Sequence, residues 1–169
     1  MKIAVLGYSG AGKSTLSREL GRRYGCPVLH LDRVRFTPGW VERDRGEALT
    51  LVENFMEGDA WVIDGNYGAF LQKRRLAEAD QIVLLDFNRW TCLGRVWRRW
   101  RSFRGATRSD MADGCIEKLD PPFLWWVLWE GRTREKRAHY RQIAADWPEK
   151  IVILRNQRQM DRYLEGLPC

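Results

Sequence analysis

The chain has 169 residues, of which 44% are hydrophobic. This length and composition suit one domain with a sizeable core, spanning residues 1–169, and leave no room for a second full domain. No segment approaches the ~18 uninterrupted apolar residues of a membrane span, and the first residues favour a strand over a signal peptide, so we expect a cytoplasmic protein without membrane contact. The net charge of +7 fits a nucleic-acid partner or a pocket for polyanionic substrates, and charge alone does not choose between them.

Short runs rich in Val, Ile or Leu alternate with helical stretches along the chain. They are Lys2–Leu6, Pro27–Leu31, Ala60–Asp64, Gln81–Asp86 and Lys150–Leu154. These runs lack alternation between apolar and polar residues, which is typical of strands buried on both faces of a parallel sheet. Right-handed crossovers between such strands predict a three-layer α/β domain.

The first run leads directly into Gly7-Tyr8-Ser9-Gly10-Ala11-Gly12-Lys13-Ser14, which matches the phosphate-loop pattern GxxxxGK(S/T). Glycines let backbone amides curl around a β-phosphate, Lys13 reaches the β- and γ-oxygens, and Ser14 can ligate Mg²⁺. The following residues have helical spacing, so the helix N-terminus and its dipole point at the phosphates. We therefore predict that the chain binds a nucleoside triphosphate. The binding residues are Gly7, Ser9, Gly10, Ala11, Gly12, Lys13, Ser14 and Thr15.

The four cysteines show neither CxxC spacing nor a nearby histidine pair. A phosphate-loop protein normally works where thiols stay reduced. We therefore expect no metal or disulfide role for Cys26, Cys92, Cys115 and Cys169.

Two segments exceed the minimal strand and helix pattern, at about 32–59 and about 90–147. We expect the first to bind the substrate and the second to form a lid. In the first segment, Phe36–Trp40 reads as a turn and Asp44–Glu57 as a helix. The predicted apolar face of this helix is Ala48, Leu51, Val52, Phe55 and Met56.

The second segment begins with a predicted amphipathic helix over 89–104. We expect its apolar stripe to pack against the core: Trp90, Leu93, Val96, Trp97, Trp100 and Phe103. Its arginines are Arg89, Arg95, Arg98, Arg99, Arg101 and Arg104. Arg95 and Arg99 share a face at i and i+4, so we predict that this pair enters the site and neutralises the transferred phosphate.

A further helix is predicted from Phe123 onward, and one of its arginines is expected near the phosphates. These arginines are Arg132, Arg134 and Arg137. The tryptophans Trp125, Trp126 and Trp129 belong either to the core or to a dimer interface, so the sequence fits a monomer or a homodimer.

The motifs together resemble the small P-loop kinases of the adenylate kinase-like group and, more closely, the bacterial DNA topology modulation proteins. The resemblance covers nearly the whole chain. In chain order it rests on GYSGAGKST, HLDRV, GWVERDR, WVIDGNY, LLDFNRW and RGATRSDMADGCIEKLD. It implies a five-stranded parallel sheet, ATP with magnesium as the phosphoryl donor, and a mobile lid that carries arginines. It implies no particular acceptor.

Phosphoryl transfer requires carboxylates near magnesium and cations near the moving phosphoryl group. Asp64 follows an apolar strand and precedes Gly65, which places it at the carboxyl edge of the sheet, where it can hold a magnesium-bound water. The resembling kinases also have an Asp-Gly pair there, although Asp-Gly is also common turn and capping chemistry. Asp86 ends the fourth strand and is a rival candidate. We prefer Asp64, because Asp86 begins a turn that leads into the next helix.

Asp32 lies just past the second strand, where related kinases that phosphorylate hydroxyl groups place a carboxylate to orient or deprotonate the acceptor. It is our candidate base, and a helix cap or a salt bridge to Arg33 or Arg35 is the alternative. We interpret His30 as a core or supporting residue, because transfer from Mg-ATP requires no imidazole.

Asn156 and Gln157 follow the last strand, where related kinases wrap the adenine ring mostly with backbone groups. The resemblance therefore assigns this position to base binding. The alternative is that these residues only begin a surface helix.

These observations predict an enzyme that transfers the ATP γ-phosphate to a small-molecule acceptor. Trp40 lies between charged residues, a mix that fits a nucleoside or nucleotide acceptor and also other small alcohols. The competing hypothesis is an ATP-dependent, nucleic-acid-binding regulator of DNA topology that lays its arginine- and tryptophan-rich helix on a phosphate backbone. Arginines that face the phosphate loop favour catalysis, whereas an exposed stripe favours nucleic acid.

Overall fold

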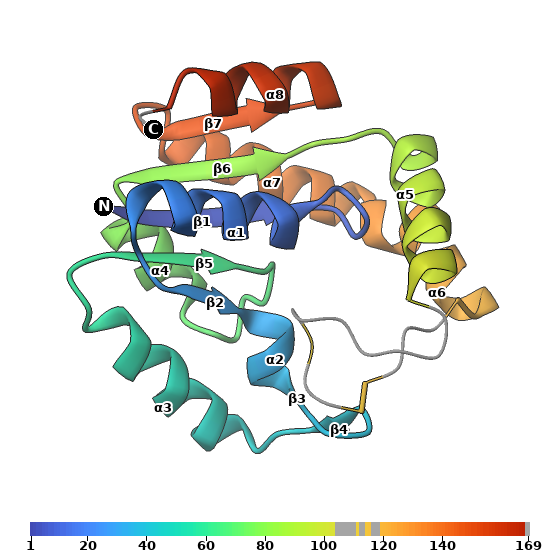
Figure 1. Cartoon of the computed structure of the whole chain (residues 1–169), viewed down its shortest axis with the longest axis horizontal. Coiled ribbons are helices and arrows are strands. Elements are labelled where there is room, and N and C mark those ends of the chain that lie inside the picture. Colours follow the sequence, from blue (N-terminus) through green and yellow to red (C-terminus); the bar gives the residue numbers. More distant parts are fainter. Residues whose placement is uncertain (104–110, 112–113, 116–118, 168–169) are drawn as a thin grey trace.

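A five-stranded parallel sheet in the order β2-β5-β1-β6-β7 forms the middle of the molecule (Figure 1). The computed structural model describes residues 1–103, 111, 114–115 and 119–167. The strands are β1 (Lys2–Gly7), β2 (Val28–His30), β5 (Trp61–Asp64), β6 (Gln81–Leu85) and β7 (Ile151–Leu154). The predicted three-layer α/β fold is confirmed. Strand ends differ by at most one residue from those predicted, as at Leu31, which begins a helix instead of ending a strand.

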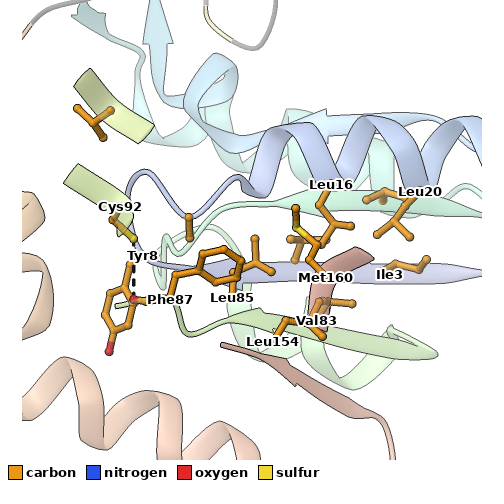
Figure 2. Packing of buried hydrophobic residues seen from close by; sticks show 14 of the residues in the cluster. Ile3, Tyr8, Leu16, Leu20, Val83, Leu85, Phe87, Cys92, Leu154 and Met160 are labelled. Carbon is orange, nitrogen blue, oxygen red and sulfur yellow. Dashed lines mark hydrogen bonds between the residues drawn. The ribbon is translucent and has the colours of Figure 1, made fainter. Parts of the chain in front are cut away.

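Helices cover both faces of the sheet. One face carries α1 (Lys13–Tyr24) and α8 (Gln157–Glu165), and the other carries α3 (Arg45–Met56), α4 (Gln72–Glu78) and α7 (Arg134–Asp146). Successive strand side chains alternate between the two cores, because side chains along a strand point to opposite faces. In Figure 2, Leu16 and Leu20 of α1 and Met160 of α8 share a cluster with strand residues such as Ile3.

The segment between β2 and β5 forms α2 (Leu31–Arg35), an antiparallel hairpin of β3 (Phe36–Thr37) and β4 (Val41–Glu42), and then α3. The predicted turn is therefore part of a hairpin, and its Trp40 takes a positive φ of 66°. Asp44 caps α3, accepting hydrogen bonds from the backbone amides of Gly46 and Glu47.

The apolar face of α3 is narrower than predicted. Ala48, Val52 and Met56 are buried and Phe55 packs partly against them, but Leu51 is 44% exposed. The buried residues follow one row at spacing i, i+4, i+8, and Leu51 lies beyond the edge of that row. One row of buried side chains, flanked by the partly buried Leu49 and Phe55, therefore packs α3 against the sheet.

The predicted packing of the aromatic stripe was wrong for much of α5 (Arg89–Ser102). Cys92 and Val96 are buried, whereas Trp90, Trp97 and Phe103 are 66%, 47% and 39% exposed. Figure 1 shows α5 beyond the carboxyl ends of the strands instead of on a face of the sheet, and its buried residues are Cys92 and Val96. Arg104, predicted to end this helix, and most of the lid motif lie outside the described residues.

The helix predicted after the lid is divided. It consists of α6 (Pro121–Leu128), a 3-10 turn (Glu130–Arg132) and α7, whose N-cap is Thr133. Trp125, Trp126 and Trp129 are 53%, 40% and 44% exposed, so these tryptophans do not belong to the core. Within the described part of the chain, we found no helix with the length and apolarity needed to cross a membrane.

Candidate active site

Helix α5 packs closely against the phosphate loop. Gly7, Gly10 and Gly12 have φ values of 143°, 80° and 98°, which favour glycine. A Cβ at Gly10 would lie 2.6 Å from the backbone oxygen of Cys92 in α5, so only glycine allows this approach. Gly12 is the N-cap of α1 and caps it without a side-chain hydrogen bond, which leaves the first amides of the helix to bind an anion.

Lys13 lies between the loop and two carboxylates. Its Nζ donates hydrogen bonds to the backbone oxygens of Gly7 (3.0 Å) and Tyr8 (3.3 Å). Burial lowers the pKa of Lys13, while Asp32 and Asp64 oppose that shift. Both predicted acidic residues are therefore close enough to act on the charge of this lysine.

Asn66 clamps the first glycine of the loop. Its side-chain Oδ1 accepts a hydrogen bond from the amide of Gly7 (3.0 Å), and its Nδ2 donates to the Gly7 oxygen (2.7 Å). Sequence reasoning did not assign this residue, although Asn66 belongs to the WVIDGNY motif. The Gly7 oxygen thus has both Lys13 and Asn66 as donors.

Asp64 is the last residue of β5 and is buried beside His30. Its Oδ2 lies 3.0 Å from the Nδ1 of His30. This contact follows from strand register, since His30 of β2 stands opposite Asp64. His30 thus acts as a supporting partner of the predicted magnesium residue.

Asp32 lies in the first turn of α2 and accepts a hydrogen bond from the hydroxyl of Tyr67, with an O···O distance of 2.5 Å. Burial and the charge of Asp32 raise the pKa of Tyr67, which keeps the phenol protonated as a donor. Arg35 instead pairs with Glu42, at 2.7 Å. The hydrogen bond from Tyr67 was not foreseen.

The loop that carries Asn66 and Tyr67, residues 65–70, is held by a buried arginine. Arg75 of α4 donates to the backbone oxygens of Phe70 (2.7 Å), Tyr67 (2.9 Å) and Gly65 (3.3 Å). Burial lowers the pKa of Arg75 to about 10, so it remains a cation at neutral pH. The fully buried Arg75 side chain therefore holds the backbone of the 65–70 loop in place through these three hydrogen bonds.

Of the predicted pair on α5, Arg95 contacts the phosphate loop. Arg95 Nη1 donates to the backbone oxygen of Ala11 (2.6 Å), its Nη2 bonds Gln157 Oε1, and its guanidinium lies 4.5 Å from the Phe87 ring centroid. Arg99 is close enough for its charge to lower the pKa of Lys13. Not all arginines of α5 lie near the loop. Arg101 lies over the exposed Trp97 on the outer surface of the helix.

Asn156 and Gln157, which the resemblance assigned to base binding, lie at the start of α8. Asn156 caps α8 by accepting a hydrogen bond from the Gln159 amide (3.0 Å), and Gln157 is its first residue. This segment therefore begins a helix, as the alternative interpretation expected, and base binding by Asn156 and Gln157 stays a prediction. The bond between Gln157 and Arg95 still brings α8 to the edge of the phosphate loop.

Asp86 does not cap the next helix. Asn88 does so, and its Oδ1 accepts a hydrogen bond from the Thr91 amide (2.9 Å). Asp86 Oδ2 instead lies 3.9 Å from Arg155 Nε.

Among the described residues, no three or more His, Cys, Asp and Glu side chains form a metal-binding group. Cys26, Cys92 and Cys115 are free thiols, and Cys169 lies outside the described residues.

Comparison with solved structures identifies the fold. Deoxyadenosine kinase from M. mycoides with bound dATP matches with a TM-score of 0.55 and 18% identity, over 98% of each chain. The same enzyme with the products dCMP and dCDP gives 0.54 and 16%, over 98% of this chain and 97% of that one. Shikimate kinase from Bacteroides thetaiotaomicron gives 0.50 and 16%, over 98% and 94%. The chain has a P-loop kinase fold.

No protein-family model and no curated protein sequence matches the chain.

Within the P-loop kinase fold, the candidate site residues all lie at or just beyond the carboxyl ends of β1, β2 and β5. They are Lys13, Asp32, Asp64 and Asn66. This edge is where ligands bind in open α/β sheets. The candidate site is therefore formed by three neighbouring strands in the sheet.

Proposed function

We propose that the protein is an ATP-dependent phosphotransferase that moves the γ-phosphate to a small-molecule acceptor, a nucleoside or a nucleotide. The observation that supports this most directly is the position of Lys13, which contacts the phosphate loop and is influenced by Asp32, Asp64 and Arg99. Phosphoryl transfer needs such an arrangement of donor-binding cation, carboxylates and further cations.

The nucleotide binds, in this proposal, with its phosphates on the amides of the loop and of the first turn of α1. Asn156 and Gln157 lie beside its base. Ser14 and Asp64 hold Mg²⁺, and the nucleotide phosphates supply further oxygen ligands. The buried Asp64 carboxylate fits this role, since His30 holds only its Oδ2 in the contact described above. Bound magnesium neutralises charge on the phosphates.

In the proposed reaction, an acceptor oxygen attacks the γ-phosphorus and the bond to the β–γ bridging oxygen breaks, which releases ADP. Asp32 orients the acceptor and takes the proton when the acceptor is a hydroxyl. Tyr67 holds one oxygen of Asp32 and so fixes the direction of the other. Lys13, Arg95 and Arg99 stabilise charge on the moving group.

The chain acts as one kinase-like domain over 1–169 in this proposal. The insertion at about 32–59 binds the acceptor, and the region at about 90–147 closes over it. Cys115 supports a contact between the two, because its Sγ lies 3.6 Å from the Thr37 oxygen in the hairpin. Trp40 packs edge-on against Phe36, at 5.3 Å, and these rings provide an aromatic surface in the acceptor insertion.

We further propose a cytoplasmic location, where ATP is available, and a monomer or homodimer. Membership of the DNA topology modulation family is also a proposal, supported by the six sequence motifs named above.

The test is transfer of labelled phosphate from Mg-ATP to a panel of nucleosides, nucleotides and small alcohols. We expect one acceptor class to be labelled, and Lys13→Ala to abolish this labelling. Lys73→Ala, which removes an exposed lysine from α4, is the matched control and should retain activity. Asp32→Asn should lower kcat by roughly 100-fold or more for a hydroxyl acceptor. Slow hydrolysis across the whole panel would contradict the proposal.

A second candidate, a nucleic-acid-binding regulator that uses ATP, is supported by the outer surface of α5. Trp90 and Trp97 are exposed there, and Arg98, Arg101 and Ser102 line a shallow hollow. DNA binding at physiological salt, lost in an Arg98→Ala and Arg101→Ala double variant, would favour this candidate. Weak binding that disappears as salt rises is expected of any basic protein and would not.

A further inference from the structure

A pocket lies on the other side of the phosphate loop from α1. It has a volume of about 360 Å³ and is bounded by the carboxyl ends of β6 and β7 and by the start of α7. We call it the back pocket. Its lining residues are Tyr8, Asp86, Phe87, Asn88, Arg89, Arg132, Arg137 and Arg155. Figure 2 shows the Tyr8 ring pointing away from α1, so this loop residue forms a wall of the back pocket.

The back pocket is strongly positive. Of the described residues that line it, Asp86 has the only carboxylate, and Asp86 already lies 3.9 Å from Arg155. Arg89, Arg132 and Arg137 add further positive charge to the same small volume. Positive groups gathered in this way repel one another, and an anion between them removes the repulsion.

Arg132 gives the back pocket a rigid cation. Its side chain is buried, with Nε donating to the Val127 oxygen (3.2 Å) and Nη2 contacting Cys92 Sγ (3.1 Å). Its guanidinium lies 3.8 Å from the Tyr8 ring centroid. Burial raises the pKa of Cys92, so the thiol is neutral at neutral pH. These partners hold the guanidinium in place without cancelling its charge.

We propose that the back pocket binds a phosphate group of a second ligand, separate from the nucleotide on the phosphate loop. Guanidinium forks match the oxygen geometry of phosphate, and arginine is preferred for such recognition. The phosphate belongs either to a free inorganic ion or to a nucleotide, and the chemistry of recognition is the same for both. Because Tyr8 belongs to the phosphate loop, a ligand in the back pocket contacts the loop from behind.

The experiment measures binding instead of activity, so it remains informative if the proposed kinase reaction fails. The full chain is first saturated with a non-hydrolysable ATP analogue and Mg²⁺, and pyrophosphate is then titrated by calorimetry. We expect one further equivalent of pyrophosphate to bind. The double variant Arg137→Ala, Arg155→Ala should weaken this binding at least roughly tenfold, through loss of charge-assisted hydrogen bonds.

The matched control is Arg141→Ala, Arg158→Ala. It removes the same charge from exposed positions on the same helix α7 and on α8, outside the back pocket. We expect its pyrophosphate affinity to stay within about twofold of the original protein. Equal losses in both double variants would mean general attraction to a basic surface, and would overturn the proposal.

Two further results would also overturn it. One is the absence of saturable pyrophosphate binding once the analogue is bound. The other is an equal loss of affinity for the analogue itself in the Arg137 and Arg155 variant, which would make the back pocket part of the nucleotide site. Parallel titrations with inorganic phosphate and AMP identify the source, since tighter binding of AMP assigns the pocket to a nucleotide.

Discussion

Replacing Arg75 by methionine tests whether the 65–70 loop is held by one buried side chain. Arg75→Met keeps a similar length and removes the donors to the backbone oxygens of Gly65, Tyr67 and Phe70. Each buried oxygen left without a donor costs about 1–3 kcal/mol. The variant also avoids the desolvation penalty of burying a charged guanidinium, which offsets part of this loss. We therefore expect the free energy of unfolding to fall by about 3–5 kcal/mol.

Urea denaturation followed by circular dichroism measures this change. The matched control is Arg74→Met, because Arg74 is the neighbouring residue and its salt bridge to Glu78 lies at the surface. The control should lose much less stability than Arg75→Met, because exposed salt bridges contribute little. If Arg75→Met loses less than about 1 kcal/mol, the buried hydrogen bonds do not hold the loop and the reasoning is wrong. Folded variant protein should bind ATP and acceptor more weakly, because the loop supplies Asn66 and Tyr67.

Three further predictions concern the site. Asn66→Ala removes both bonds to Gly7, so ATP affinity measured by calorimetry should fall about tenfold, and the unfolding temperature should also fall because the buried Gly7 amide loses its acceptor. Tyr67→Phe frees the Asp32 oxygen, so kcat should fall while KM for ATP stays constant, and a raised KM for ATP would contradict this role. Burial lowers the pKa of Lys13, and only the protonated amine attracts phosphate. ATP affinity should therefore decline as pH rises through this lowered pKa, with the decline beginning below the ordinary value of 10.5; a constant affinity up to that pH would refute it.

The fold was largely readable from the sequence because its signals are local. Five apolar runs without alternation defined the strands, and the phosphate-loop pattern located the loop between β1 and α1. The two sheet faces follow from the alternation of side chains along each strand. The exposure of Trp90 and Trp97 was not readable, because periodicity tells which residues share a helix face but not whether another element covers that face.

The candidate site was readable in part for the same reason. Lys13 lies in a local motif, and Arg95 was chosen from helical spacing, so both could be assigned before the fold was known. The contacts of Asn66 with Gly7 and of Tyr67 with Asp32 join residues that are 59 and 35 positions apart. Such pairs depend on sheet order, which a single sequence does not specify.

The central position of β1 also has a consequence for biosynthesis. β1 leaves the ribosome first, but its partners β5 and β6 end at Asp64 and Leu85. The amides of Gly7 and Tyr8 find their acceptors, Asn66 and the Leu85 oxygen, only in those later segments. During translation, the hydrogen bonds that hold the phosphate loop therefore form only after the chain has been synthesised beyond Leu85, about half of its length. Capture of ATP by a nascent chain would thus mark the moment when the middle of the sheet closes.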